Sequence, residues 1–406
     1  MTAWAQLLHF YQPPTQTHDI LRRVADESYR PLIRVIREHE NARLAVNING
    51  VLTEMLIEHG MSDVVTGLAE LAERGRIEFT GSGKFHPILP LIPDDYRDRS
   101  ISENASANRA AFGPAWQPSG FFPPEMCYSS DIVHSIASGG YDWVIVSGVA
   151  CPIEWTTTSV AQLDSGGRTL GVLFRDDGLS NSISFRHTDA TRFVKGLAAR
   201  GRDGYVVTAM DAETYGHHLR HWERDFLAAA FAAVAASDGD VEIVRPSELF
   251  QRFPPGPVVE PLASSWSTSL DDIAAGNPYP LWNSPGNETQ GLQWDIVHHG
   301  IALTASAAAH ADTEAARRAW VIADERLQPA LHSCQFWWAS RRPMWDVPMI
   351  HRGLQLLVEA ALYAAKSVRS SGAPGDVKAQ AGWRLAAVNE ARAQLERELF
   401  GADRSE

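Results

Sequence analysis

Two carboxylic acids stand where short apolar runs of the sequence end. Residues 205–210 are apolar, aromatic or β-branched and are followed by Asp211 and Glu213, and the run at 119–124 leads into Glu125 in the same way. A pair of carboxylates suits cleavage of a glycosidic bond, because one can attack the sugar or assist water while the other, kept protonated, donates to the leaving oxygen. An acid after a strand can also simply cap the next helix. The pair alone therefore leaves both readings open.

Other polar residues follow candidate strands and could contact a sugar. Sugar rings offer hydroxyl groups to hydrogen-bonding side chains and apolar faces to aromatic rings, so a site that binds them needs both kinds of residue. We expect Trp282 to be the stacking platform. The polar contacts expected from their positions are His9, Gln12, His86, Glu213 and His218.

These residues must be positioned by alternating strands and helices. Short apolar runs predict strands at 4–10, 44–49, 76–80, 119–122, 143–147, 170–175, 205–211 and 241–245, and helical spacing predicts helices between most of them. This alternation favours an α/β fold with a mainly parallel sheet, open or closed into a barrel. Residues just past the carboxyl ends of parallel strands line the ligand crevice in such folds. Both acids are therefore expected at the mouth of one pocket.

The character of the chain changes after the last predicted strand. Residues 256–300 are rich in Pro, Gly, Ser, Asn and Trp and lose periodicity, whereas residues 301–406 are rich in Ala and Leu at helical spacing. We expect a barrel domain over 1–255, a segment at 256–300 that contributes to the substrate cleft, and a helical bundle over 301–406 packed on the barrel.

Composition excludes some classes of partner. The 36 Lys and Arg against 49 Asp and Glu give a net charge of −13, which argues against binding to nucleic acid or to anionic membranes. The 3 cysteines form no C-x-x-C pair, and neither a signal peptide nor a membrane span is recognisable. We expect a cytoplasmic location, and the sequence does not indicate an oligomeric state.

At this point the chain resembles glycoside hydrolase family 57. His9-Phe10-Tyr11-Gln12-Pro13 is similar to the family's first motif, H-x-H-Q-P, with Tyr11 in place of the second histidine. The stretch 81–90 with His86-Pro87, then 122–126 ending in Glu125-Met126, resemble the second and third motifs. The stretch 211–216 is similar to the fourth, D-G-E-x-F-G, and 282–287 loosely to the fifth.

The resemblance implies a (β/α)7 barrel, an incomplete relative of the eight-stranded barrel, followed by a C-terminal helical domain. It implies that Glu125 is the nucleophile and Asp211 the general acid/base of a retaining enzyme, without a metal or other cofactor. The implied substrates are α-1,4-glucans or maltooligosaccharides, hydrolysed as by an amylase. Transfer to another sugar, by a 4-α-glucanotransferase or a branching enzyme, is the alternative. The carboxyl groups should then lie about 5–5.5 Å apart, with the Glu125 charge raising the pKa of Asp211.

Two further readings remain. Donor atoms for a divalent metal are present in Asp211, Glu213, His217, His218, His9 and His86, as a carbohydrate deacetylase or a metal-using mannosidase would need. Against this, the resemblance to family 57 implies that no catalytic metal is needed. The other possibility is a carbohydrate-binding protein that keeps the fold without catalysis.

Overall fold

The computed structural model describes residues 1–200 and 203–402, which divide into two compact units, Met1–Leu270 and Asp271–Glu406. The strands, all in the first unit, are β1 (Thr2–Phe10), β2 (Leu44–Ile48), β3 (Ile77–Gly81), β4 (Gly120–Phe121), β5 (Trp143–Ser147), β6 (Val160–Asp164), β7 (Thr169–Arg175), β8 (Gly204–Asp211), β9 (Val241–Val244) and β10 (Pro255–Val258). The α-helices of this unit are α1 (His18–Val24), α2 (Arg30–Glu38), α3 (Gly50–Glu58), α4 (Ser62–Glu73), α5 (Asp94–Phe112), α6 (Val133–Ser138), α7 (Asp177–Ser184), α8 (Ala190–Ala199), α9 (Ala229–Ala235), α10 (Pro246–Arg252) and α11 (Leu270–Ala274), the last of which crosses into the second unit.

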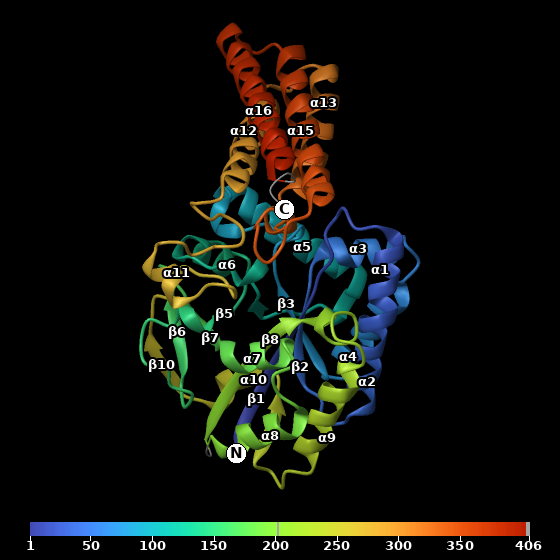
Figure 1. The fold of residues 1–406 in the computed structure, drawn as a ribbon, viewed down its shortest axis with the longest axis vertical. Coiled ribbons are helices and arrows are strands. Elements are labelled where there is room, and N and C mark those ends of the chain that lie inside the picture. Colours follow the sequence, from blue (N-terminus) through green and yellow to red (C-terminus); the bar gives the residue numbers. More distant parts are fainter. Residues whose placement is uncertain (201–202, 403–406) are drawn as a thin grey trace. The chain divides into compact units, whose positions relative to one another are not determined.

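Seven parallel strands form the centre of the first unit, in the order β8-β1-β2-β3-β4-β5-β7. β1 and β8 lie side by side although they are distant in sequence (Figure 1). β9 pairs in parallel with the first half of β1, and β6 joins the other end of the sheet, antiparallel to β7. The predicted α/β class with a mainly parallel sheet is confirmed.

β1 is buried along its whole length, as expected for a parallel strand that is covered on both faces. Alternate residues share a face of a strand, and Ala3, Ala5 and Leu7 of β1 join a single apolar core with Tyr205, Val207 and Ala209 of β8. The same core takes residues from β2, β5, β7 and β9, and Leu249 of α10. The strands thus surround a common interior.

The junction between β7 and β8 is not a strand pairing within the described residues. One backbone hydrogen bond crosses it, from the N–H of Asp176 to the carbonyl of Val207 at 2.7 Å. We call this junction the seam. Side chains at the seam contribute to the candidate site.

Some elements differ from the sequence prediction. The strands β6 and β10 and the helices α7 and α10 were not predicted. Residues 19–40 show helical spacing, and in the structure this stretch is interrupted by a π-helical turn, Ala25–Tyr29. Pro31 explains the interruption: it has no N–H to donate to the carbonyl of Glu27 four residues earlier, and the neighbouring N–H of Arg30 binds the carbonyl of Ala25 five residues back.

The second unit is helical, as predicted. Its main helices are α12 (Glu288–His310), α13 (Glu314–Ala330), α14 (Cys334–Trp337), α15 (Val347–Ser370) and α16 (Gly375–Ala402). α12 begins inside the stretch expected to lack periodicity, with Asn287 as its N-cap. The ring of Trp294 stacks on Phe336 at 4.1 Å in its core.

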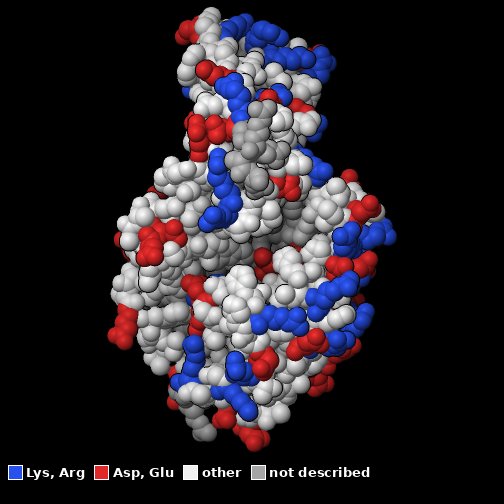
Figure 2. Space-filling model, in the orientation of Figure 1, with Lys and Arg blue, Asp and Glu red and all other residues white. Residues whose placement is uncertain are grey.

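Over the part of the chain that the structure describes, no helix is both long and apolar enough to cross a bilayer. Basic and acidic side chains are interspersed on the face shown in Figure 2.

Candidate active site

A polar layer lies on top of the apolar interior of the first unit. Because side chains alternate along a strand, a residue two positions beyond an interior residue faces the same way. Five strands each place a polar residue two positions after a core residue, at or near the carboxyl end of the strand. These residues are His9, Asn47, Ser147, Arg175 and Asp211, which follow Leu7, Ala45, Ile145, Leu173 and Ala209.

Strand register brings part of this layer into one row. Asp211 is the register partner of His9, and His9 is the partner of Asn47. Asn47 in turn is paired with Thr80 of β3 and donates to its hydroxyl at 3.0 Å. Direct pairing of β1 with β8 thus places Asp211 and His9 side by side at one edge of the sheet.

Glu125 lies on a strained turn after β4. It adopts φ 57°, Met126 adopts φ 50°, and both are in the left-handed region that non-glycine residues rarely occupy. Such a conformation costs on the order of 1–3 kcal/mol and is concentrated at functional sites. The turn is supported by residues 264–266, since the N–H of Trp266 donates to the carbonyl of Glu125 at 3.2 Å and Tyr128 pairs with Ser264.

An aromatic stack connects the two acids. The His9 and His86 rings stack at 4.8 Å, Phe122 stacks on His9 at 4.8 Å, and Tyr11 lies 3.9 Å from His86 and 5.9 Å from His9. The Nδ1 atom of His86 lies 3.6 Å from Oε1 of Glu125. Asp211 is therefore next to one histidine of the stack and Glu125 is next to the other.

The hydrogen bonds of His9 define its tautomer. Asn47 donates through its Nδ2 to Thr80 and Gly81, so its Oδ1 is the acceptor for the Nδ1–H of His9, at 2.7 Å. Burial lowers the pKa of His9 to about 4, although the Asn47 contact opposes this, so the ring is neutral at pH 7. Its Nε2 is buried and has no hydrogen-bond partner among the described residues.

Asp211 and Glu213 form a second, electrostatically coupled pair of acids. Burial raises the pKa of Asp211 to about 6, and the positive charge of Arg175 opposes the rise. Burial, and then the charge of Asp211, raise the pKa of Glu213 to about 8. A raised pKa is the expected direction for Asp211, and burial is its largest cause.

The π-helical turn Ala25–Tyr29 supports the segment that follows Asp211. Ser28 donates to the carbonyl of Ala212 at 2.9 Å, and the Tyr29 hydroxyl donates a short hydrogen bond to Oε1 of Glu213. Glu27 pairs with His217 at 2.7 Å. Gly216 passes so close to this turn that a Cβ atom would lie 1.8 Å from the Glu27 carbonyl oxygen.

Comparison with known proteins identifies the family of this chain. Residues 5–260, more than half of the chain, match glycosyl hydrolase family 57. The chain belongs to this family. It is 25% identical over 276 residues to an α-amylase of Pyrococcus horikoshii and 26% identical over 276 residues to a 4-α-glucanotransferase of Thermococcus kodakarensis. Each match covers 64% of this chain but only 42% and 41% of the relative, respectively.

Among solved structures, the GH57-type branching enzyme of Pyrococcus horikoshii is similar, with a TM-score of 0.72 and 14% identity. The similarity covers 96% of each chain, and at this identity it supports the fold alone.

In this family 57 protein, the remaining predicted contacts lie in different places. Gln12 donates to Oε1 of Glu213 at 3.1 Å, so it reaches the acid pair. His218 lies in the segment after Glu213 and has an exposed side chain. Its backbone N–H donates to the carbonyl of Glu213 at 2.8 Å. Trp282 belongs to the second unit and is 1% exposed, so its ring presents no open face for stacking. Its role as a platform stays a prediction.

Four residues of the site were missed from the sequence: Tyr29, Asn47, Arg175 and Trp266. Asn47 and Arg175 are polar residues at the ends of apolar strands, a signal that was available in the sequence. Tyr29 lies in the π-helical turn and has no local signal. Trp266 is half-buried and meets the rings of His9 and Phe122 edge to face at 6.0 and 5.7 Å, so it is a candidate stacking surface.

The donor atoms considered for a metal are in part used by protein contacts. His9 binds Asn47 through Nδ1, His217 binds Glu27, and Glu213 accepts from Tyr29 and Gln12. Within residues 1–200 and 203–402, no three His, Cys, Asp or Glu side chains are grouped so that they could bind a metal ion.

Proposed function

We propose that this protein is a retaining glycosidase of α-1,4-linked glucans or maltooligosaccharides, with Glu125 as the nucleophile and Asp211 as the general acid/base. The observation that carries the proposal is the placement of the two acids on either side of the stacked His9 and His86 rings. Asp211 is the register partner of His9, and Glu125 is 3.6 Å from His86. The names of the relatives, α-amylase and 4-α-glucanotransferase, support the same substrate class.

The first step breaks the glycosidic bond. Glu125 attacks the anomeric carbon through a carboxylate oxygen while protonated Asp211 donates its proton to the leaving glycosidic oxygen. Burial favours the protonated form of Asp211, which is the form required here. The product is a glycosyl ester on Glu125 and a shortened glucan.

The second step releases the sugar. Asp211, now ionised, takes a proton from the acceptor hydroxyl, which attacks the anomeric carbon and frees the Glu125 carboxylate. Water as acceptor gives hydrolysis, and a sugar hydroxyl gives transfer. We propose hydrolysis as the main reaction. Chromatography after incubation with a single maltooligosaccharide distinguishes the two, since only transfer produces chains longer than the substrate.

The roles of the two acids are tested by amide substitution. Glu125→Gln and Asp211→Asn should each lower kcat by about 10³-fold or more, because each removes a group that acts on the reacting atoms. Circular dichroism and the melting temperature should stay close to the unsubstituted values. The matched controls are Glu58→Gln and Asp19→Asn at exposed positions, and these should keep full activity. Full activity in either site variant would contradict the assignment.

Azide separates the two roles. In Glu125→Ala, azide can replace the nucleophile and should give a glycosyl azide of inverted configuration. In Asp211→Ala, azide should attack the glycosyl enzyme and give a product of retained configuration, provided the substrate has a good leaving group. The opposite pattern would exchange the two roles.

A further inference from the structure

We infer that Arg175 is the positioning residue of Asp211: it holds β8 at the seam and places a fixed positive charge beside the acid that must lose and regain a proton. This inference rests on the proposed role of Asp211 as general acid/base. Arg175 ends β7, on the other side of the seam from Asp211. It belongs to the same polar layer.

The first observation is how completely Arg175 is held. Its side chain is 3% exposed, and its three nitrogen atoms have three different acceptors. Nε donates to the carbonyl of Ala209 at 2.8 Å, while the two terminal nitrogens donate to Asp177 at 2.7 Å and to Asn181 at 2.9 Å. A planar guanidinium bound on all sides has little freedom to move.

The second observation is what this arrangement does to β8. β7 and β8 do not pair as strands, so backbone groups of β8 at the seam need other partners. Arg175 takes the carbonyl of Ala209, and Ser180 accepts from the N–H of the same residue at 3.2 Å. Ala209 is two residues before Asp211. The acid is therefore carried on a strand that β1 holds on one side and that side chains hold at the seam.

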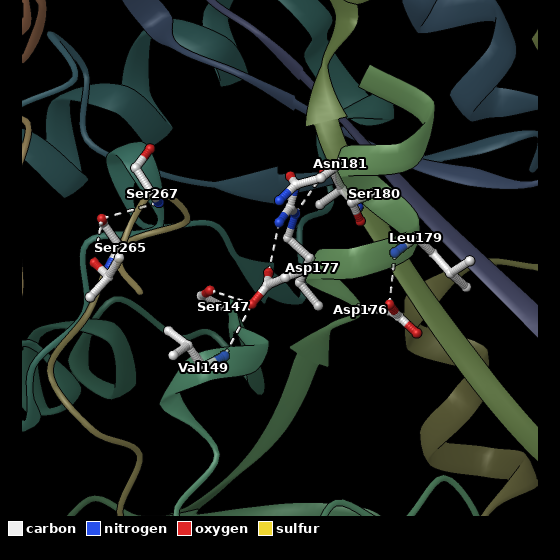
Figure 3. Close-up of polar contacts among 12 residues, drawn as sticks. Ser147, Val149, Asp176, Asp177, Leu179, Ser180, Asn181, Ser265 and Ser267 are labelled. Carbon is white, nitrogen blue, oxygen red and sulfur yellow. Dashed lines mark hydrogen bonds and ion pairs between the residues drawn. The ribbon is translucent and has the colours of Figure 1, made fainter. Parts of the chain in front are cut away.

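The third observation is that Arg175 has its own supports. Asp177 binds Arg175 through one carboxylate oxygen and accepts from the Ser147 hydroxyl at 2.8 Å and the Val149 N–H at 3.0 Å through the other. Figure 3 shows Asp177 reaching toward Ser147 and Val149, with Ser180 and Asn181 further along the same helix, α7. The ends of β5 and β7 are thus linked to the acid through one network.

The charge has a chemical purpose in the proposed cycle. Asp211 is neutral when it donates a proton and negative when it accepts one, and a buried carboxylate is strongly destabilised without a nearby cation. The positive charge of Arg175 favours the ionised form and opposes the effect of burial on the pKa of Asp211. The other ionisable groups around Asp211 are Glu213 and Tyr29 toward the π-helical turn and His9 on β1.

The experiment compares kcat/KM against pH for the whole chain, with a maltooligosaccharide as substrate. The alkaline limb should reflect the pKa of Asp211 in the free enzyme, about 6. Arg175→Gln removes the charge and should move this limb to higher pH by about one unit or more. Asp177→Asn keeps an acceptor but removes the negative charge beside Arg175, so it should move the limb to lower pH.

Two further variants separate charge from position. Arg175→Lys keeps the positive charge but loses the planar set of N–H donors. It should therefore leave the alkaline limb of the kcat/KM profile at the same pH and lower kcat. Arg97 is the matched control: it is also 3% exposed, and it donates to the carbonyls of Leu89, Ile92 and Asp131. Arg97→Gln should lower the melting temperature without moving the limb. Shifts of the same sign in Arg175→Gln and Asp177→Asn, or no shift in either, would overturn the inference.

Direct titration of Asp211 tests the role of Arg175 independently of the proposed function. Carboxyl ¹³C NMR of protein labelled at aspartate, with the Asp211 signal identified by its loss in Asp211→Asn, reports the same group without turnover. A higher titration point in Arg175→Gln supports the inference even if the protein does not cleave α-glucans. An unchanged titration point refutes it even if the protein does. If Arg175→Gln does not fold, the titration point of Asp211 is measured in Asp177→Asn instead, where it should be lower than in the unsubstituted protein.

Discussion

Glu213 stands next to the proposed proton donor, and its burial favours the neutral form although the hydrogen bonds donated to its carboxylate favour the ionised form. Its Oε1 accepts from Tyr29 and Gln12, and its side chain is 4% exposed. Burial and the charge of Asp211 raise the pKa of Glu213. When Asp211 is ionised, Glu213 is thus protonated at neutral pH, and the pair carries one negative charge rather than two.

This makes the stability of the protein dependent on Glu213 and pH. An acid whose folded pKa is raised contributes stability below its unfolded pKa, and that contribution is lost as the pH rises through the folded pKa, here about 8. Glu213→Gln keeps the acceptor oxygen and cannot ionise. Its free energy of unfolding relative to wild type should therefore rise between pH 5 and pH 8, on the order of 3 kcal/mol.

Urea denaturation at several pH values measures this difference. Glu58→Gln, at an exposed position, is the control and should show no such trend. A constant difference between Glu213→Gln and wild type over this pH range would mean that Glu213 ionises normally in the folded protein.

At the scale of single residues, the sequence indicated the two candidate acids more readily than the side chains that contact them. Asp211 and Glu125 follow apolar runs, and His9 and His86 belong to recognisable motifs. Tyr29 contacts Glu213 from 184 positions away in the chain, through a helix whose pattern contains no sign of the contact. Trp282 shows why the sequence alone does not identify an aromatic binding surface. A tryptophan in a polar stretch can be either exposed to a ligand or buried, and Trp282 is 1% exposed.

Among the elements, the π-helical turn Ala25–Tyr29 has a clear use. A π turn adds one residue to a helical turn, and such turns are frequent at functional sites. Here it allows three successive residues to reach the segment after Asp211: Glu27 contacts His217, Ser28 contacts Ala212 and Tyr29 contacts Glu213. The glycine of the fourth motif is explained by the same contact, since Gly216 lies against the Glu27 carbonyl.

Gly216→Ala tests this packing. The residue adopts φ 107°, and the added methyl group would overlap the Glu27 carbonyl oxygen, so the turn must shift. We expect a loss of several degrees in melting temperature and a large loss of activity. Gly140→Ala is the control, because Gly140 also has positive φ, at 87°, but open space around its Cβ position. Equal losses in both variants would show that backbone conformation, not the contact, matters at Gly216.

The elements that the sequence failed to predict share physical reasons. β6 (VAQLD) and β10 (PGPV) are short; β10 is the edge strand of the sheet and β6 is its neighbour, so both lie away from the central strands. α7 is short and rich in polar residues, although its N-cap Asp176, which accepts from Leu179, was a usable signal. The central strands, which are buried on both faces, were predicted to within a few residues.

At the scale of the whole molecule, the described contacts of the proposed site come from the first unit. Asp211, Glu125 and their contacts all lie within Met1–Leu270, and none of the chemistry proposed for them needs a cofactor. Metal removal tests this directly. Dialysis against EDTA should leave both activity and melting temperature unchanged. Loss of activity that Zn²⁺ or another divalent ion restores would support the metal-dependent alternative instead.

β1 is buried along all nine residues, and it needs β8 on one side. The partners His9 and Asp211 are 211 − 9 = 202 residues apart. At a synthesis rate of about 5–20 residues per second, a ribosome needs roughly 10–40 s to deliver β8 after β1 has been made. During that interval one edge of an apolar strand has no partner and can pair with another chain. Yield in the cell should therefore depend on protecting β1 until Asp211, the last residue of β8, has been made.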